Sequence, residues 1–355
     1  MVGRLASAYD LVVVGGGIVG MMTAQRYLER FPNKRVLLVE KEYLGAGATV
    51  KSGVLASDLV ETPELRTWSD ESQAYYELIQ FTTIRDIYQP LSAYYLYESA
   101  DRVPNGHTGD QMAGGQFIHK LPSWLARNTG MVAVTGKARY INPQDLITHF
   151  ARCFARNKSI KVLEQTTVEH IEPFGNDLHL VKAGKELFYA NAIAVCTGPW
   201  PFDSFGMKGL RNKRIVSFII DEVPVSSDRV LYFPEEGAFL LPQEDKNQWL
   251  LSVTSTQWDV SADDVFDFRS DDWALAFRFA NKYLSLEHGA IQPGNVFCDA
   301  YSPNKIPVIK HHPTMKRVVY AGGGSGRGVR LAPVIALEAL KALDIEVEAP
   351  LNKYT

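Results

Sequence analysis

The feature that most constrains the fold of this 355-residue chain is a glycine-rich turn that joins an apolar run to a helical pattern. The run Leu11–Val14 is short, continuous and rich in β-branched residues, which predicts a buried parallel strand. It leads into Gly15, Gly17 and Gly20, with the spacing GxGxxG, and then into apolar residues at helical spacing. The sequence therefore predicts a strand–turn–helix unit whose helix N-terminus can hold a phosphate group.

Each glycine of this turn has a separate physical task. Gly15 permits the tight turn, Gly17 lets a pyrophosphate approach the backbone, and Gly20 lets the helix pack closely on the strand. A second strand, Val36–Val39, is followed at once by Glu40, which can accept hydrogen bonds from an adenosine ribose. The pattern favours a dinucleotide site, and the alternative is a βαβ unit that binds no nucleotide.

Net charge and cysteine usage limit the partners and the compartment. The formal net charge of −3 gives no reason to expect nucleic acid or an anionic membrane as a partner. Cys153, Cys196 and Cys298 lie far apart, which argues against a disulfide framework and a zinc site and fits a reducing compartment. Because the sequence fits neither a signal peptide nor a membrane span, we expect a soluble, cytoplasmic protein of about two domains. Its oligomeric state stays open.

Periodicity and turn-forming residues predict the other elements of the chain. One helix start is well marked, because Asn142 can cap the helix and Pro143 suits its first position. Before Asn142 we expect a small-residue loop at 45–53, a helix and then an aromatic strand within 61–100, and an exposed loop at 101–118. After the helix that begins at Asn142 we expect two strands around 160–172 and 178–188 and a buried strand at 192–196. An antiparallel sheet within 214–258 and a charged helix near 262–284 follow.

The C-terminal segment carries a second strong signal. Residues 317–321 form an apolar, strand-like run, and Gly322–Gly328 form a second glycine-rich loop. Val329–Leu343 then show apolar residues at helical spacing. The chain therefore has a glycine loop followed by a helix N-terminus near each of its ends.

Four blocks of the sequence, in this order, resemble the D-amino-acid oxidase superfamily of FAD-dependent oxidoreductases, the group that includes glycine oxidase and sarcosine oxidase. The blocks are the N-terminal fingerprint with Glu40, the loop at 45–53, the helix start at Asn142 with the strand that leads into Thr197-Gly198-Pro199-Trp200, and residues 302–309 ahead of 324–333. The resemblance spans nearly the whole chain, and its last block is far more specific than GxGxxG.

The resemblance implies an α/β fold with FAD as the cofactor. A Rossmann-type FAD-binding domain would be interleaved with a substrate domain built on an antiparallel or mixed sheet. The FAD-binding domain would comprise residues 1–58, 140–205 and 314–355, and the substrate-binding domain residues 59–139 and 206–313.

The resemblance also assigns residues to the cofactor. The N-terminal turn would hold the FAD pyrophosphate, Glu40 the adenosine ribose, and the backbone near Val168 the adenine. The loop at 324–329 would present N–H groups and a helix dipole to the flavin, whose reduced form is an anion. The full set of implied FAD-binding residues is Gly15, Gly16, Gly17, Ile18, Val19, Gly20, Glu40, Lys41, Gly47, Ala48, Thr49, Ser52, Gly53, Val54, Val168, Thr197, Gly198, Trp200, Gly324, Ser325, Gly326, Arg327, Gly328 and Val329. No set of metal ligands stands out.

The implied reaction is the oxidation of an amine or amino acid to the imine by hydride transfer to flavin, with O2 or another acceptor reoxidising the flavin. Arg330 and Arg327 are candidates to bind a substrate carboxylate, because the guanidinium fork suits a bidentate contact. A helix dipole disfavours a cation at this end, so a nearby anion is expected. Lys51 is a candidate for oxygen activation, because the strand 248–252, where some relatives keep a lysine, has none.

Some positions depart from the pattern of the family. Asp299 and Ala300 stand where many relatives have Arg-Pro, and Asn304 stands where they have Asp. Asp299 can bind a substrate ammonium, but a buried salt bridge or a surface acid fits it better. Cys298 misses by one position a cysteine that tethers the flavin in sarcosine-oxidase-like members, so a buried, inert thiol is expected.

Two further groups of residues invite a functional interpretation. The aromatic residues Tyr94, Tyr97, Tyr232 and Trp249 suit the walls of a substrate cavity, although aromatic residues on strands more often pack within the sheet. The pair His311-His312 falls in a polar connection and is expected at the surface.

Three other functions stay open. A hydroxy-acid or polyol-phosphate dehydrogenase of the same fold needs a base for the hydroxyl proton, so a histidine or lysine over the flavin would favour it. An NAD-dependent reductase would use the turn at Gly15–Gly20, but the C-terminal glycine loop argues against it. A flavin-binding subunit of a larger complex, without turnover of its own, would explain the absent Arg and Asp around 299–304.

Overall fold

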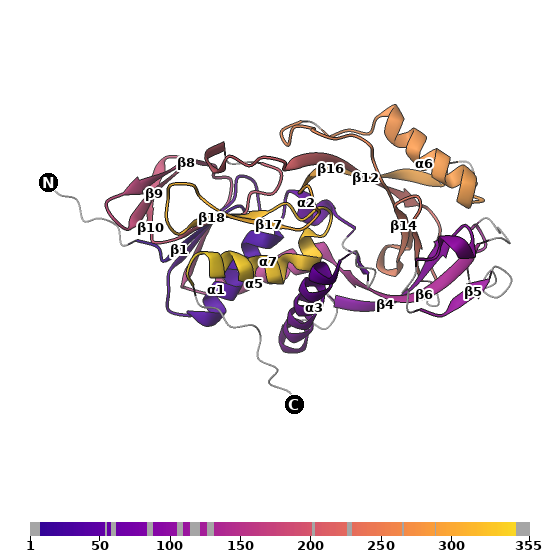
Figure 1. Ribbon diagram of the computed structural model, residues 1–355, viewed down its shortest axis with the longest axis horizontal. Coiled ribbons are helices and arrows are strands. Elements are labelled where there is room, and N and C mark those ends of the chain that lie inside the picture. The colour runs from indigo at the N-terminus through magenta and orange to yellow at the C-terminus, as the bar shows by residue number, and fades with distance from the viewer. Residues whose placement is uncertain are drawn as a thin grey trace.

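The computed structural model describes residues 8–53, 55–57, 62–83, 88–104, 109–113, 121–125, 131–200, 203–225, 229–264, 266–287 and 289–345. A six-stranded sheet and a nine-stranded sheet lie in two halves of the molecule, on the left and right of Figure 1. The helices α1 (Ile18–Arg30), α5 (Pro143–Arg156) and α7 (Gly328–Ala342) cover the first, and α6 (Ser270–Tyr283) covers the second.

The six-stranded sheet is mainly parallel and contains the predicted βαβ unit. Its order is β17-β18-β11-β1-β2-β7, and β17 pairs antiparallel with β18. Within it, Val12 pairs with Ile193 on one side and with Leu37 on the other. The strands are β1 (Leu11–Val14), β2 (Val36–Val39), β7 (Ile160–Leu163), β11 (Ile193–Val195), β17 (Val308–His311) and β18 (Val318–Gly322).

Both faces of this sheet are covered, as hydrophobic parallel strands require. On one face Leu11 and Val13 share a core with Met21 of α1 and Leu331 of α7. On the other face Val12 packs against a three-stranded sheet of β8 (Val168–Phe174), β9 (Leu178–Ala183) and β10 (Glu186–Ala190). The result is a three-layer half of the molecule with β1 at its centre.

Glycine sets how closely α1 approaches β1. Gly15 has a φ of +101°, a conformation that strains any residue with a side chain. A Cβ atom on Gly20 would lie 1.9 Å from the carbonyl oxygen of Gly15. The structure therefore agrees with the turn and packing tasks predicted for Gly15 and Gly20.

The nine-stranded sheet is mainly antiparallel, as the alternating pattern within 214–258 predicts. Its path is β16-β12-β15-β14-β13-β4-β6-β3, with β5 paired to β6, and β13 runs parallel to β4. The strands are β3 (Leu55–Ser57), β4 (Tyr88–Tyr97), β5 (Gln111–Ala113), β6 (Val132–Ile141), β12 (Arg211–Ile220), β13 (Val230–Phe233), β14 (Ala238–Gln243), β15 (Gln248–Val253) and β16 (Ile291–Tyr301).

Several elements differ from the sequence-based expectation. The segment 45–53 contains one helical turn, α2 (Ala48–Lys51), where a loop was expected, and 160–188 forms four strands in place of two. α6 begins at Ser270 because the Asp272 carboxylate accepts the Arg269 N–H at 2.8 Å and so fixes the first turn. The other helices among the described residues are α3 (Pro63–Thr83) and the short 3-10 turns Ala100–Arg102, Asp203–Phe205 and Glu244–Lys246.

The structure also bears on the expected absence of a membrane span and on the loop expected at 101–118. In the part of the chain that the structure describes, no helix has the length and apolar character needed to cross a membrane. Of the loop expected at 101–118, the described part contains the end of a 3-10 turn and strand β5. The domain boundaries stay a prediction.

A buried ion pair attaches α6 to the nine-stranded sheet. The guanidinium of Arg214, on β12, donates to both carboxylate oxygens of Asp272, at 3.2 and 2.6 Å, and both side chains are fully buried. Asp272→Ala should lower the free energy of unfolding by about 3–5 kcal/mol, because a buried guanidinium is left without its partner. Urea unfolding measures this loss.

The matched control is Asp259→Asn, which removes the charge of the exposed partner of Arg211 and still suits the φ of +57° at this position. That change should cost less than about 1 kcal/mol, because water already solvates both charges. Equal losses in the two variants would contradict the anchoring task of the Arg214–Asp272 pair.

Candidate functional site

A cavity of about 490 Å³ lies between the two large sheets. On one side its wall contains the carboxyl ends of β1, β2, β11 and β18 with the loops that follow them. On the other side it contains side chains of β12, β15 and β16. Ligands of open α/β sheets bind at the carboxyl edge, so this cavity is the candidate active site.

The glycine turn presents the start of α1 to this cavity. The first-turn N–H groups of a helix have no partner within the helix, and Gly17, at the N-cap, supplies no side-chain cap. One of these groups, the Ile18 N–H, donates to Thr49 Oγ1 at 3.0 Å. A Cβ on Gly17 would meet Thr49 Oγ1 at 3.6 Å and no closer atom, so this position borders open space. The turn thus fits a pyrophosphate.

Glu40 is held by backbone groups at one end of the cavity. Its Oε2 accepts the Gly16 N–H at 2.6 Å, and its Oε1 accepts the Glu42 N–H at 2.9 Å. A carboxylate has about four lone-pair sites, so capacity for a ribose hydroxyl is left. Val168 also lines the cavity, and Thr166, two residues before it, donates its N–H to the carbonyl oxygen of Glu40 at 2.9 Å.

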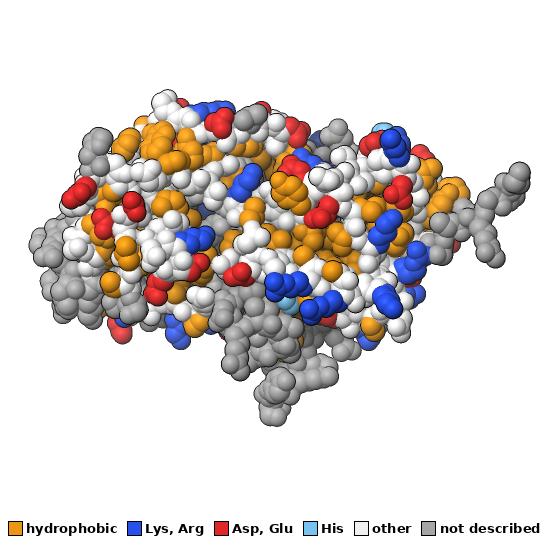
Figure 2. All heavy atoms as spheres, turned by 180° about the vertical axis from the view of Figure 1, so that it is seen from behind, with side chains coloured by type: hydrophobic (Ala, Val, Ile, Leu, Met, Phe, Trp, Pro, Cys, Tyr) orange, Lys and Arg blue, Asp and Glu red, His pale blue; other side chains and the backbone are white. Residues whose placement is uncertain are grey.

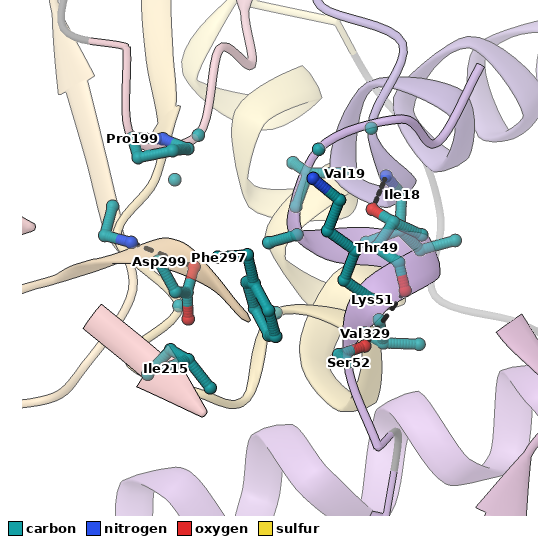
Figure 3. A pocket seen from close by; sticks show the side chains of 18 of the residues that line it. Ile18, Val19, Thr49, Lys51, Ser52, Pro199, Ile215, Phe297, Asp299 and Val329 are labelled. Atoms are coloured by element: carbon teal, nitrogen blue, oxygen red, sulfur yellow. Dashed lines mark hydrogen bonds between the residues drawn. The ribbon is translucent and has the colours of Figure 1, made fainter. Parts of the chain in front are cut away.

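α2 and its neighbours form the middle of the wall. Figure 3 shows Thr49, Lys51 and Ser52 with Ile18 and Val19 on one side of the cavity, and Phe297 and Asp299 on the other. Ser52 Oγ donates to the carbonyl oxygen of Thr49 at 3.0 Å, which closes the turn of α2.

Trp200 closes the wall beside Gly47. A Cβ on Gly47 would lie 3.5 Å from the Trp200 ring, an ordinary van der Waals distance, so the indole packs directly over this position. Lys41 Nζ lies 3.7 Å from the centre of that ring, and the indole N–H donates to Asp263 at 2.7 Å. These contacts join the six-stranded sheet to the segment before α6.

The C-terminal glycine loop lines the cavity with its backbone. Ser325 turns its side chain inward, where its Oγ accepts the Ser302 N–H at 3.1 Å and donates to the Gly323 carbonyl at 3.2 Å. The Gly326 N–H donates to Asp299 Oδ2 at 2.8 Å. The loop is therefore attached to β16 on the substrate side of the cavity.

Asp299 is neither the buried salt bridge nor the surface acid that the sequence favoured. Besides the Gly326 N–H, it accepts the Ala300 N–H at 2.9 Å, and no cation of the described residues lies within 4.0 Å of it. Burial raises the pKa of this carboxyl, and the two N–H donors oppose the rise. A carboxylate in the cavity wall with a raised pKa can bind an ammonium or accept a proton.

Most of the expected site residues lie together in this wall. The expected residues that line the cavity are Gly15, Gly17, Ile18, Val19, Glu40, Lys41, Gly47, Ala48, Thr49, Lys51, Ser52, Gly53, Val168, Thr197, Gly198, Trp200, Gly324, Gly326, Gly328, Val329 and Arg330. Their contacts with a cofactor or substrate stay predictions. Val54 lies outside the described residues.

Four of the expected residues do not line the cavity and lie behind the residues that do. Gly16 donates its N–H to Glu40, Gly20 packs α1 on β1, and Ser325 is turned inward. Arg327 Nη1 reaches the carbonyl oxygens of Lys305 and Ser325, at 3.5 and 3.4 Å. Position therefore favours Arg330 over Arg327 for a substrate in the cavity.

Sequence reasoning missed several residues of the cavity wall, and it left the role of an aromatic set open. Lys213, Phe239, Leu250 and Tyr301 line the cavity. Their strands were recognisable, but the face that each strand turns to the cavity depends on sheet pairing. The aromatic set Tyr94, Tyr97, Tyr232 and Trp249 packs within or against the cores of the nine-stranded sheet, which confirms the packing alternative.

The cysteine and histidine expectations are also resolved. Cys298 lies between Phe297 and Asp299 on β16, so its side chain points to the opposite face, and it is buried. Burial raises the pKa of its thiol to about 12, which fits an inert cysteine. His311 is exposed, as expected, whereas His312 is half-buried and accepts the Met315 N–H at 3.1 Å.

The match to a family model decides the class of the protein. A model described as FAD dependent oxidoreductase (DAO) matches residues 10–341. The chain belongs to this family. It is therefore an FAD-dependent oxidoreductase, and the glycine turn, Glu40 and the C-terminal loop face a cavity suited to that cofactor.

Solved structures of the family share the fold along nearly the whole chain. Glycine oxidase from Bacillus cereus ATCC 14579 has a TM-score of 0.78 and 15% identity, over 97% of this chain and 99% of that one. L-Proline dehydrogenase from P. horikoshii has a TM-score of 0.79 and 17% identity, over 99% of this chain and 97% of that one. L-α-Glycerophosphate oxidase from Mycoplasma pneumoniae, with FAD bound, has a TM-score of 0.76 and 16% identity, over 98% of this chain and 97% of that one. These likenesses confirm the fold class. They do not identify a substrate.

Curated relatives match over a short segment. L-2-Hydroxyglutarate dehydrogenase of Escherichia coli (strain K12) is 40% identical over 57 residues, which are 16% of this chain and 14% of that protein. The mitochondrial enzyme of Caenorhabditis briggsae is 47% identical over 57 residues, 16% of this chain and 13% of that protein. The chain thus matches about a seventh of the length of these relatives.

Gly17→Val should give a folded protein that binds little FAD. The fold has room for a side chain at this position, but the side chain would occupy the space that a pyrophosphate needs. The absorbance of the purified protein and of the cofactor released on denaturation measures FAD content.

Gly20→Ala provides the contrast for this prediction. Its methyl group would overlap the carbonyl of Gly15, so this variant should lose stability in urea unfolding as well as FAD. A folded Gly17→Val protein with full FAD content would contradict the placement of the pyrophosphate.

Proposed function

We propose that the protein oxidises an α-amino acid or a related amine to the imine. The supporting observation is that two groups of opposite charge line one cavity. Arg330 lies in the first turn of α7, and Asp299 lies on β16. This pair complements the carboxylate and the ammonium of a zwitterionic amino acid.

The cofactor assignments rest on the same walls. The start of α1 would hold the pyrophosphate of FAD, Glu40 the ribose, and the backbone near Val168 the adenine. The loop Gly322–Gly328 and the positive end of α7 would face the flavin ring. When bound, FAD supplies the acceptor for the hydride that leaves the substrate carbon.

The residues of the chain would bind the substrate and hold a proton. Arg330 would hold the carboxylate through a bidentate contact, which fixes the orientation of the α-carbon. Asp299 would accept a hydrogen bond from the ammonium. Because burial raises the pKa of Asp299, it accepts a proton more readily than an exposed aspartate, and a neutral amine loses hydride more easily.

A hydroxy acid is the second candidate substrate, since two observations favour it. The short curated matches are to proteins named L-2-hydroxyglutarate dehydrogenase. Lys51 and Lys213 line the cavity, where a base for the hydroxyl proton is needed. Lys51 also stays the candidate for reaction with O2 in the reoxidation of the flavin, and another electron acceptor is the alternative.

Anaerobic reduction of the flavin separates these substrates. The purified holoenzyme is mixed, without O2, with α-amino acids, amines and 2-hydroxy acids that carry the same side chains. Bleaching of the flavin by amino acids or amines supports the proposal, and bleaching by hydroxy acids alone supports the second candidate. No bleaching by any class would contradict both and favour a flavin-binding subunit without its own turnover.

Arg330→Ala should slow flavin reduction at low substrate by roughly 30- to several-thousand-fold. The loss of one partner of a desolvated, charge-assisted contact costs about 2–5 kcal/mol. Arg330→Lys should recover part of the rate, because the charge survives without the fork. Anaerobic stopped-flow measures the rate, and FAD content should stay at the parent level.

Arg327→Ala is the matched control, since it removes the same charge from behind the wall. It should change the reduction rate far less than Arg330→Ala. A larger loss in the Arg327 variant, or a collapse of FAD content with unchanged reduction in the Arg330 variant, would show that the carboxylate assignment is wrong.

A further inference from the structure

Lys213 is a second cation in the wall, on the side of the nine-stranded sheet. It lies on β12 directly opposite Asp299 of β16, and both residues line the cavity. Ile215 and Ser217 follow it on the same face, whereas Arg214 faces α6. The side chain of Lys213 is therefore placed beside the substrate region by the pairing of two strands.

Two aromatic rings fix the ammonium group of Lys213. Its Nζ lies 5.0 Å from the centre of the Trp258 ring and 5.4 Å from the centre of the Tyr301 ring. The two rings meet edge to face, with centres 5.2 Å apart and an interplanar angle of 81°. Cation–π contacts of this kind hold a flexible lysine in one region without neutralising it.

The charge of Lys213 has no close counter-ion in the described part of the chain. No carboxylate there lies within 4.0 Å of its Nζ. Asp299, on the paired strand, holds its carboxylate oxygens toward the N–H groups of Ala300 and Gly326 and beyond 4.0 Å from the Lys213 Nζ. Burial lowers the pKa of Lys213, and the charge of Lys305 lowers it further. An anion that enters the cavity would offset both effects.

We propose that Lys213 binds a second carboxylate of the substrate and so makes the enzyme selective for dicarboxylic acids. The inference rests on the proposed function, in which Arg330 holds the first carboxylate. A substrate with an uncharged side chain would leave the half-buried ammonium without an anion, whereas a side-chain carboxylate would pair with it. Lys213 is a specificity-determining residue in this account, and the hydride transfer does not involve it.

The test compares glutarate with its monoamide, which has the same shape and one charge less. Each is titrated into the holoenzyme, and the change in the flavin absorption spectrum gives the dissociation constant without any turnover. The parent should bind glutarate roughly 10- to 100-fold more tightly than the monoamide. Lys213→Met should abolish this preference, and Lys213→Arg should retain most of it. Parent-like FAD content and thermal stability show that each variant is folded.

Lys305→Met is the matched control. Lys305 is exposed and close enough to affect Lys213, but it does not line the cavity. Its loss removes the same charge and should leave most of the preference for glutarate.

Three results would overturn the proposal. The first is equal binding of glutarate and its monoamide by the parent, and the second is an unchanged preference in Lys213→Met. The third is a slower flavin reduction at saturating substrate with the glutarate preference intact, which would make Lys213 a base. If the preference depends on Lys213 but no amino or hydroxy acid bleaches the flavin, the anion site stands and the proposed function fails.

Discussion

The contact between Gly20 and the carbonyl of Gly15 is the constraint on which the cofactor side of the site depends. It brings α1 so close to β1 that the helix N-terminus opens at the carboxyl edge of the six-stranded sheet. The Ile18 N–H then donates to Thr49, which positions α2. α2 in turn carries Lys51 into the wall opposite β16. A single close approach of backbone to backbone therefore sets the position of one half of the cavity.

The second half of the cavity is organised around Asp299, which joins structure to chemistry. Its hydrogen bond from the Gly326 N–H attaches the C-terminal loop to the nine-stranded sheet, so the segment next to Arg330 is held against the substrate side. The same carboxylate lines the cavity, with lone pairs left after its two backbone contacts. Asp299 thus offers a negative charge to the cavity and attaches the C-terminal loop through the same carboxylate.

The parts of the site that sequence alone predicts are those with a local cause. GxGxxG, Glu40 and the C-terminal glycine loop require particular residues at short spacing, so they were recognisable. Lys213 was not recognised, and Asp299 was given a salt bridge or a surface position as its favoured role, because the pairing of β12 with β16 decides which face meets the cavity. The same reason explains why Trp249, a good candidate by residue type, lies fully buried in the core under α6. The turn of α2 was missed because small residues alone give no helical periodicity.

The most direct test of the account is a crystal structure of the holoenzyme with 2-methylglutamate, an α-amino acid that lacks the hydrogen on its α-carbon and so cannot be oxidised. The account predicts that its α-carboxylate contacts the guanidinium of Arg330 and that its ammonium contacts the carboxylate of Asp299, beside the flavin ring. A complex in which the ligand lies in the cavity with its ammonium away from Asp299, or in which FAD does not meet the start of α1, would contradict it.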